Sequence, residues 1–129
     1  MKYKTLLGIA AFLMLSIAVL PVLAWPPGYS PGYWKHQINA WIDDKGRPQI
    51  TYDQLMSYTA SIDSYYGVVP APYYEGYQLW PVSEFDYNSD GAFTIEDAYN
   101  IFNDHTWNYK WTPLANWYNY VAGLAPWVD

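Results

Sequence analysis

The sequence predicts a small, mainly α-helical domain with long aromatic-rich loops, after an N-terminal signal helix. Three observations lead to this fold class. Apolar residues recur at helical spacing in several segments, strand-like alternation is weak throughout, and proline and glycine gather between the helical segments. A chain of 129 residues has room for one domain and hardly more.

The first 24 residues have the pattern of a secretory signal peptide. A short basic start precedes an almost continuous apolar run over residues 6–20, and small residues follow up to Ala24. A retained membrane anchor is the alternative, but a spanning helix needs about 20 apolar residues and this run is shorter and ends at Pro21. We therefore predict a signal peptide over residues 1–24 and a single domain over residues 25–129. The mature protein would be secreted, extracellular or at the cell surface, with no membrane span.

Two helices are predicted in the first half of the domain, after a turn-rich lead-in over residues 25–32. The first helix, over residues 33–42, has one apolar stripe consisting of Trp34, Ile38, Trp41 and Ile42. Thr51 stands three residues before Gln54, which is the spacing of a capping box, so a second helix is predicted from Tyr52 to about Tyr65.

Two more helices are predicted after an irregular connector over residues 67–81. One runs from Thr94 or Ile95 to about Asn103. The last is expected over residues 114–122, opened by Pro113 and ended by a glycine.

The charge and the lack of cysteine narrow the classes of partner. Two of the six basic residues lie in the first 24 residues and all 12 acidic residues follow them, so the mature chain carries a net charge of −8. This excludes nucleic acid as a partner, because phosphates need a basic surface. Small exported domains often rely on disulfides or a metal for stability, and the lack of cysteines rules out disulfides and favours a metal.

Aromatic residues are unusually frequent in the predicted domain. Eight Trp, fourteen Tyr and three Phe remain after residue 24, more large rings than a core of this size needs. We expect some of them to be exposed, where they would bind glycans, protein partners or a second copy of the chain.

Residues 86–97, DYNSDGAFTIED, have the spacing of a calcium-binding loop. A twelve-residue loop wraps one Ca²⁺ ion when oxygen ligands stand at positions 1, 3, 5, 7, 9 and 12 and glycine at position 6. Gly91 fills position 6, and Phe93 at position 8 would anchor the loop in the core. The predicted ligands, including the backbone carbonyl of position 7, are Asp86, Asn88, Asp90, Ala92, Thr94 and Asp97.

This pattern resembles the EF-hand loop and, more closely, the dockerin repeat. The EF-hand has Glu at position 12, whereas Asp97 matches the aspartate of the dockerin loop, which also has an apolar residue at position 8. The resemblance covers residues 86–102 and implies an EF-hand-like helix-loop-helix that binds Ca²⁺. The alternative is an Asx-rich turn that caps a helix through Thr94 and binds nothing.

Dockerins carry two such repeats, and this chain has at most a degenerate second one. A window over residues 43–54 aligns with the loop, but Lys45 and Arg47 stand at positions 3 and 5 and would repel calcium. If the two windows paired, their position-8 residues, Ile50 and Phe93, would meet. The alternative is that any helix capped by threonine aligns equally well.

A second resemblance concerns residues 30–41, SPGYWKHQINAW. It is similar to the PG-[FY]-WK-N-H segment of small exported proteins, although His36 and Gln37 depart from the usual Asn-His order. This resemblance implies export and no particular chemistry.

The sequence has no arrangement typical of an enzyme. Serines lack a nucleophile-elbow setting, His36 and His105 stand alone, and the spacing of Glu75 and Glu84 is not that of a catalytic pair. We predict a secreted, non-catalytic calcium-binding module with a structural, adhesive or protein-interaction role at the cell surface. The alternative is a glycan-binding module that uses exposed Tyr and Trp to bind polysaccharide.

Overall fold

The computed structural model describes residues 25–128, so the predicted signal peptide lies outside the described residues. The helices are α2 (Pro31–Ile42), α3 (Tyr52–Asp63), α4 (Ile95–Asn103) and α5 (Trp111–Val121). The short elements are β1 (Tyr73–Tyr74), β2 (Tyr77–Gln78), and the 3-10 helices η1 (Val82–Phe85) and η2 (His105–Lys110). The prediction of a small, mainly α-helical domain is confirmed.

The first two helices both begin with a local cap, although α2 starts at Pro31, two residues before the predicted start, and its Ser30 cap was not predicted. Ser30 caps α2 by accepting the Tyr33 N–H at 3.2 Å. The capping box of α3 is complete, because the Gln54 N–H donates to the Thr51 hydroxyl at 3.1 Å and the Thr51 N–H donates to Gln54 Oε1 at 2.9 Å. Each bond satisfies a backbone group that the first turn leaves without a helical partner.

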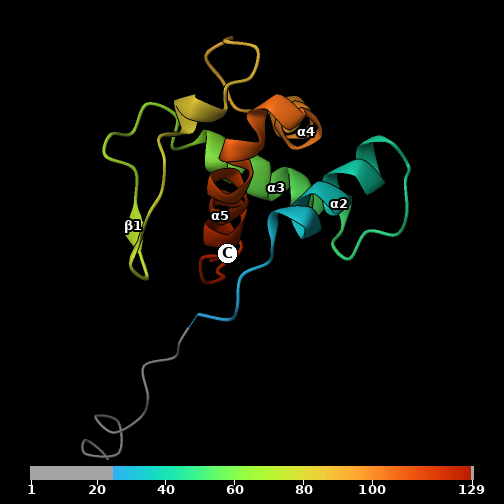
Figure 1. The fold of residues 1–129 in the computed structure, drawn as a ribbon, viewed down its shortest axis with the longest axis horizontal. Coiled ribbons are helices and arrows are strands. Elements are labelled where there is room, and N and C mark those ends of the chain that lie inside the picture. Colours follow the sequence, from blue (N-terminus) through green and yellow to red (C-terminus); the bar gives the residue numbers. More distant parts are fainter. Residues whose placement is uncertain (1–24, 129) are drawn as a thin grey trace, which may run out of the picture.

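The helices surround one aromatic-rich core, with α5 at its centre (Figure 1). In α5 the side chains from Pro113 to Asn119 are all buried, because the helix has neighbours on every side. Helix α2 contacts both α4 and α5, and α3 packs along α5. Among residues 25–128, no helix is long and apolar enough to cross a membrane.

Several details of the predicted elements are wrong. Trp41 and Ile42 are 39% and 43% exposed, because the last turn of α2 extends past the core that buries Trp34 and Ile38. The last helix begins at Trp111, so Pro113 lies within its first turn, where no helical bond is required of its nitrogen. The connector also contains a short hairpin, in which β1 and β2 have two residues each, and the sequence did not indicate it.

The element before the predicted calcium loop is shorter than a helix-loop-helix requires. A single 3-10 turn, η1, leads into the loop, whereas α4 follows it as predicted. The loop is anchored instead by buried side chains. Val82 and Phe85 lie before the loop, and Phe93 lies within it.

The lead-in and the C-terminal tail lie side by side at the end of the molecule opposite the loop (Figure 1). The Ala125 N–H donates to the Pro26 carbonyl at 2.7 Å. Two fully buried asparagines of α5 hold these segments. Asn119 exchanges hydrogen bonds with the backbone of Tyr29, and Asn116 does the same with the backbone of Trp127.

Candidate metal centre

The structure brings three of the predicted calcium ligands together. Asp86, Asp90 and Asp97 each offer a carboxylate oxygen, and these oxygens all lie within 4.8 Å of one another. Local backbone geometry makes this possible, because Ser89 and Gly91 adopt left-handed φ angles of 58° and 84° that turn the chain back on itself.

Asp86 is held at the start of the loop by groups near and far in sequence. Its Oδ1 accepts the Asp90 N–H at 3.1 Å, and its Oδ2 accepts the Gly91 N–H at 2.8 Å and the Tyr66 hydroxyl at 2.9 Å. Partial desolvation raises the pKa of this carboxyl, but the hydrogen bonds outweigh it and the pKa lies below its ordinary value. Asp86 is therefore ionised at neutral pH.

Asp97 closes the loop from a buried position at the start of α4. Its Oδ1 accepts the Tyr87 N–H at 3.1 Å, and its Oδ2 accepts the Thr94 N–H at 2.8 Å and the Thr94 hydroxyl at 3.2 Å. Burial raises the pKa of Asp97 above its ordinary value despite these bonds, and the charge of Asp86 adds to the increase.

The other predicted ligands lie in the same loop, and their contacts differ. Asn88 and Thr94 are exposed. The Thr94 hydroxyl is directed at Asp97, so its oxygen is close to the acidic cluster. The Ala92 N–H donates to Asp90 Oδ1 at 3.1 Å, which fixes the loop backbone at position 7. The structure thus gathers the acidic ligands, and the proposed roles of Asn88 and Ala92 rest on loop position.

The donor set fits a hard cation. All the offered atoms are carboxylate, amide, hydroxyl or carbonyl oxygens, which are the ligands that calcium prefers. Three ionised carboxylates this close repel one another, and a divalent cation between them would replace that repulsion by attraction.

Two residues that support the loop were missed by sequence reasoning. Tyr66 bonds Asp86 from beyond the end of α3, and Asp63 Oδ1 accepts the Phe93 N–H at 2.8 Å. Both contacts join residues 20 or more positions apart, so no local sequence pattern predicts them.

The proposed pairing of two loops is not what the structure shows. The Phe93 N–H donates to Asp63, and the Ile50 N–H donates to Gln37 Oε1 at 3.2 Å. The backbones at the two position-8 residues are therefore bonded elsewhere, and residues 43–54 form a turn and a capped helix start.

No protein-family model matches the chain, and no curated protein or solved structure matches it either. Its function is therefore inferred from its own residues.

Proposed function

We propose that the chain is an exported, non-catalytic module in which the loop at residues 86–97 binds one Ca²⁺ ion that stabilises the fold. The protein acts outside the cell or at its surface, where it contacts a protein partner or a second copy of itself. The proposed ligands are Asp86, Asn88, Asp90, Ala92, Thr94 and Asp97.

One observation carries this proposal: three carboxylates at positions 1, 5 and 12 of a twelve-residue calcium-loop pattern have oxygens within 4.8 Å of one another. An Asx turn that only caps a helix needs no acid at position 5 and no convergence of charge. The buried position of Asp97 adds to the support, because a buried carboxylate is costly unless an opposite charge compensates it.

A structural role agrees with the position of the loop in the fold. Phe93 is buried in the core and α4 packs on α2. The loop therefore connects elements that are packed against the rest of the fold. An ion there would hold the end of η1 against the start of α4, which is the work that a disulfide does in other small exported domains.

The contacts of the two histidines support a non-catalytic module. A ring nitrogen of His36 is hydrogen-bonded to the Arg47 carbonyl at 2.8 Å, and the His105 ring packs edge-on against Trp111 at 5.9 Å. A surface role is supported by large rings exposed on several sides of the domain: Tyr29, Trp41, Tyr52, Tyr73 and Tyr109.

Calcium should raise the thermal stability of the purified protein. At a concentration 100 times the dissociation constant, binding to the folded state alone adds about 2.7 kcal/mol, or roughly 10 °C in Tm for a domain of this size. Differential scanning fluorimetry in a calcium titration, after treatment with chelator, measures this shift.

The matched variants are Asp90→Ala and Asp53→Ala. Both remove one exposed aspartate, but Asp53 lies in the first turn of α3 and outside the loop. Asp90→Ala should abolish the calcium-dependent shift, whereas Asp53→Ala should retain it. An unchanged Tm at millimolar calcium, or an equal shift in both variants, would contradict the proposed site.

A further inference from the structure

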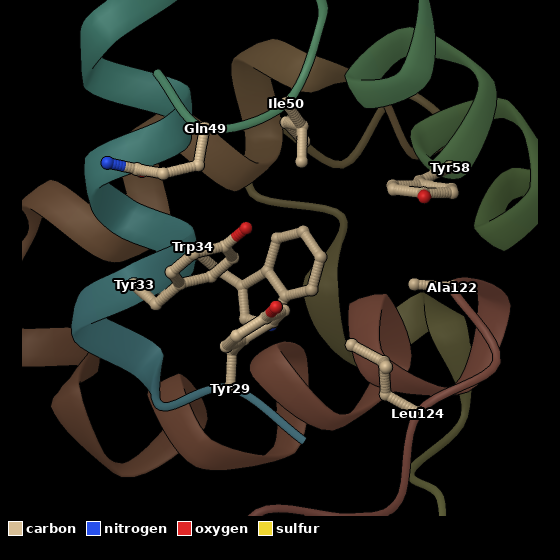
Figure 2. A pocket seen from close by; sticks show the side chains of 8 residues that line it. All are labelled: Tyr29, Tyr33, Trp34, Gln49, Ile50, Tyr58, Ala122 and Leu124. Atoms are coloured by element: carbon tan, nitrogen blue, oxygen red, sulfur yellow. The ribbon is translucent and has the colours of Figure 1, made fainter. Parts of the chain in front are cut away.

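A pocket with aromatic walls lies between the lead-in, the start of α2, the middle of α3 and the segment that follows α5 (Figure 2). None of its lining residues belongs to the acidic loop, residues 86–97. Its volume is about 410 Å³, within the range of small-molecule sites in proteins. The residues that line it are Tyr29, Tyr33, Trp34, Gln49, Ile50, Tyr58, Ala122 and Leu124. We refer to it as the tyrosine pocket.

The aromatic walls of the tyrosine pocket hold one another in place. Tyr29 and Tyr33 stack at 3.8 Å between ring centroids, and Trp34 stands edge-on to Tyr33 at 5.1 Å. Tyr58 meets Trp34 edge-on from α3 at 6.1 Å. Walls that are ordered without a ligand lower the entropic cost of binding one.

Trp34 is fixed from behind the pocket. Its indole N–H donates to the buried Asn119 Oδ1 at 3.0 Å, and its ring stacks on Tyr118 at 5.2 Å. The core therefore covers one face of the indole, and Trp34 supports the other aromatic walls. Tyr29 and Tyr58 provide the ring surface that a ligand can reach.

Three phenol hydroxyls in the tyrosine pocket are available for hydrogen bonding. The hydroxyls of Tyr29, Tyr33 and Tyr58 form no hydrogen bond with any other residue in the range 25–128. Burial raises the pKa of Tyr33, and the neighbouring Tyr29 and Tyr58 raise it further, so its hydroxyl stays protonated at neutral pH. Each hydroxyl can both donate and accept.

The lining contains no acidic, basic or histidine side chain. A charged ligand would therefore be desolvated without a partner of opposite charge. The net charge of −6 for the chain further disfavours an anionic ligand.

A cage for a quaternary ammonium group fits this geometry less well. Such cages surround the cation with several ring faces. Here Tyr29 and Tyr33 cover one face of each other, and Tyr118 covers one face of Trp34, so few faces remain free. Phenol hydroxyls beside apolar ring surface instead match a molecule that carries both hydroxyl groups and C–H faces.

We propose that the tyrosine pocket binds one neutral sugar ring of a glycan. The C–H face of the sugar packs on the Tyr29 and Tyr58 rings, and its hydroxyl groups bond the phenols of Tyr29, Tyr33 and Tyr58. This is a second site, separate from the acidic loop, and it adds carbohydrate binding to the proposed structural role of calcium.

The test is saturation-transfer NMR and intrinsic fluorescence on the purified protein with four probes. The probes are the methyl glycosides of glucose, galactose, mannose and N-acetylglucosamine, and tetramethylammonium is tested in parallel. At least one sugar should bind, with saturation passing from aromatic protons to the ring protons of the sugar.

Two pocket variants and one pair of controls locate the site. Tyr29→Ala removes the most exposed wall and should weaken binding about tenfold or more, and Tyr58→Phe removes one hydroxyl and should weaken it about three- to tenfold. Tyr73→Ala and Tyr73→Phe change an exposed tyrosine of β1 outside the pocket and should leave the affinity unchanged. Circular dichroism confirms that each variant folds.

The same measurements can overturn the proposal. It fails if none of the four glycosides binds at about 10 mM, or if the Tyr73 variants weaken binding as much as the pocket variants do. It also fails if tetramethylammonium binds and the sugars do not, which would assign the pocket to a quaternary ammonium ligand. Sugar binding that persists with chelator keeps the pocket independent of the calcium site.

Discussion

Asn119 is a buried side chain whose hydrogen bonds join parts of the chain that are 90 residues apart. Its Oδ1 accepts the Tyr29 N–H and the Trp34 indole N–H, and its Nδ2 donates to the Tyr29 carbonyl and to Asn116 Oδ1. All four bonds are formed in a fully buried position. Removing the amide would leave the Trp34 indole N–H without a partner in the core and would break both bonds to the Tyr29 backbone, whereas Asn116 Oδ1 would keep the Trp127 N–H.

Asn119→Ala should therefore lower the free energy of unfolding by about 3–5 kcal/mol. Urea denaturation monitored by tryptophan fluorescence measures the change. Asn108→Ala is the matched control, because Asn108 is exposed in η2, and it should change stability by no more than about 0.5 kcal/mol. Similar losses in the two variants would show that the buried network contributes little.

If the proposed calcium site is right, Asp97 makes the effect of calcium depend on pH. A carboxyl whose pKa is raised in the folded state binds a proton more tightly there, so without metal its contribution to stability falls as the pH rises from the ordinary aspartate pKa through the pKa of Asp97. Calcium needs the ionised carboxylate. The pKa of Asp86 is lowered, so Asp86 stays charged across this range.

The calcium-dependent rise in Tm should therefore grow as the pH increases from about 4 to about 7. Thermal unfolding at matched ionic strength, with calcium and with chelator, measures it at each pH. Asp97→Asn should remove both the shift and its pH dependence. A calcium shift of the same size at every pH would mean that Asp97 does not bind the ion.

Single residues also show how far sequence reasoning reaches. The spacing of Asp86, Asp90 and Asp97 is local, so a twelve-residue pattern was enough to predict that they converge. Asp63 at the end of α3 and Tyr66 just after it reach the loop, and their roles depend on how α3 packs. The tyrosine pocket was foreseen only as a surplus of aromatic rings, because its walls come from four separate parts of the chain.

Among the helices, those with a local start signal were predicted best. Thr51 and Thr94 cap helices whose starts were predicted, whereas the Ser30 cap was missed and α2 begins two residues earlier than expected. The 3-10 helices η1 and η2 were missed, since each is a short turn stabilised by its neighbours. Lys110 in η2 illustrates this: its ammonium donates to the Glu84 carbonyl of η1 at 2.5 Å and lies 4.3 Å from the Trp107 ring centroid.

Two glycines, one at the contact between the lead-in and the tail and one in α2, should respond differently to substitution by alanine. A methyl group on Gly28 would lie 1.9 Å from the Ala125 carbonyl oxygen, whereas one on Gly32 in α2 would meet only the Ser30 hydroxyl oxygen at 3.7 Å. Gly28→Ala should therefore push the two segments apart. Gly32→Ala should be neutral or stabilise α2 by about 0.5–1 kcal/mol, because alanine restricts the unfolded chain.

Hydrogen exchange separates these effects. In Gly28→Ala the Ala125 amide, which donates to Pro26 across the two segments, should exchange faster. The amides of Tyr29 and Trp127, which tie the segments to Asn119 and Asn116 of α5, should also exchange faster, while those in α3 keep their protection. Gly32→Ala should show no such change. Unaltered exchange at these three amides in Gly28→Ala would contradict the close approach of the segments.

For the domain as a whole, monovalent salt and calcium should raise Tm in different ways. Monovalent salt screens the repulsion of an acidic surface and should raise Tm gradually in the native protein and in Asp90→Ala alike. Calcium at the same ionic strength should add a saturable increase in the native protein only. If sodium chloride reproduced the whole calcium effect, the ion would act by screening.

The fold class followed from composition and periodicity, but the closure of the domain did not. No pattern in the lead-in shows that its backbone is held by Asn119 or that the tail is held by Asn116. These asparagines stand inside an apolar helix, and their partners are identified only by the three-dimensional arrangement.

The hydrogen bond between Pro26 and Ala125 also makes the domain suitable for circular permutation. Since the lead-in and the tail are neighbours, a short Gly-Ser bridge could connect them without crossing the molecule, and new ends could be opened in the exposed turn at residues 44–47. Such a circular permutant would keep both the acidic loop and the tyrosine pocket. For the same reason, the domain could be grafted into a surface loop of a host protein, entering and leaving at a single point.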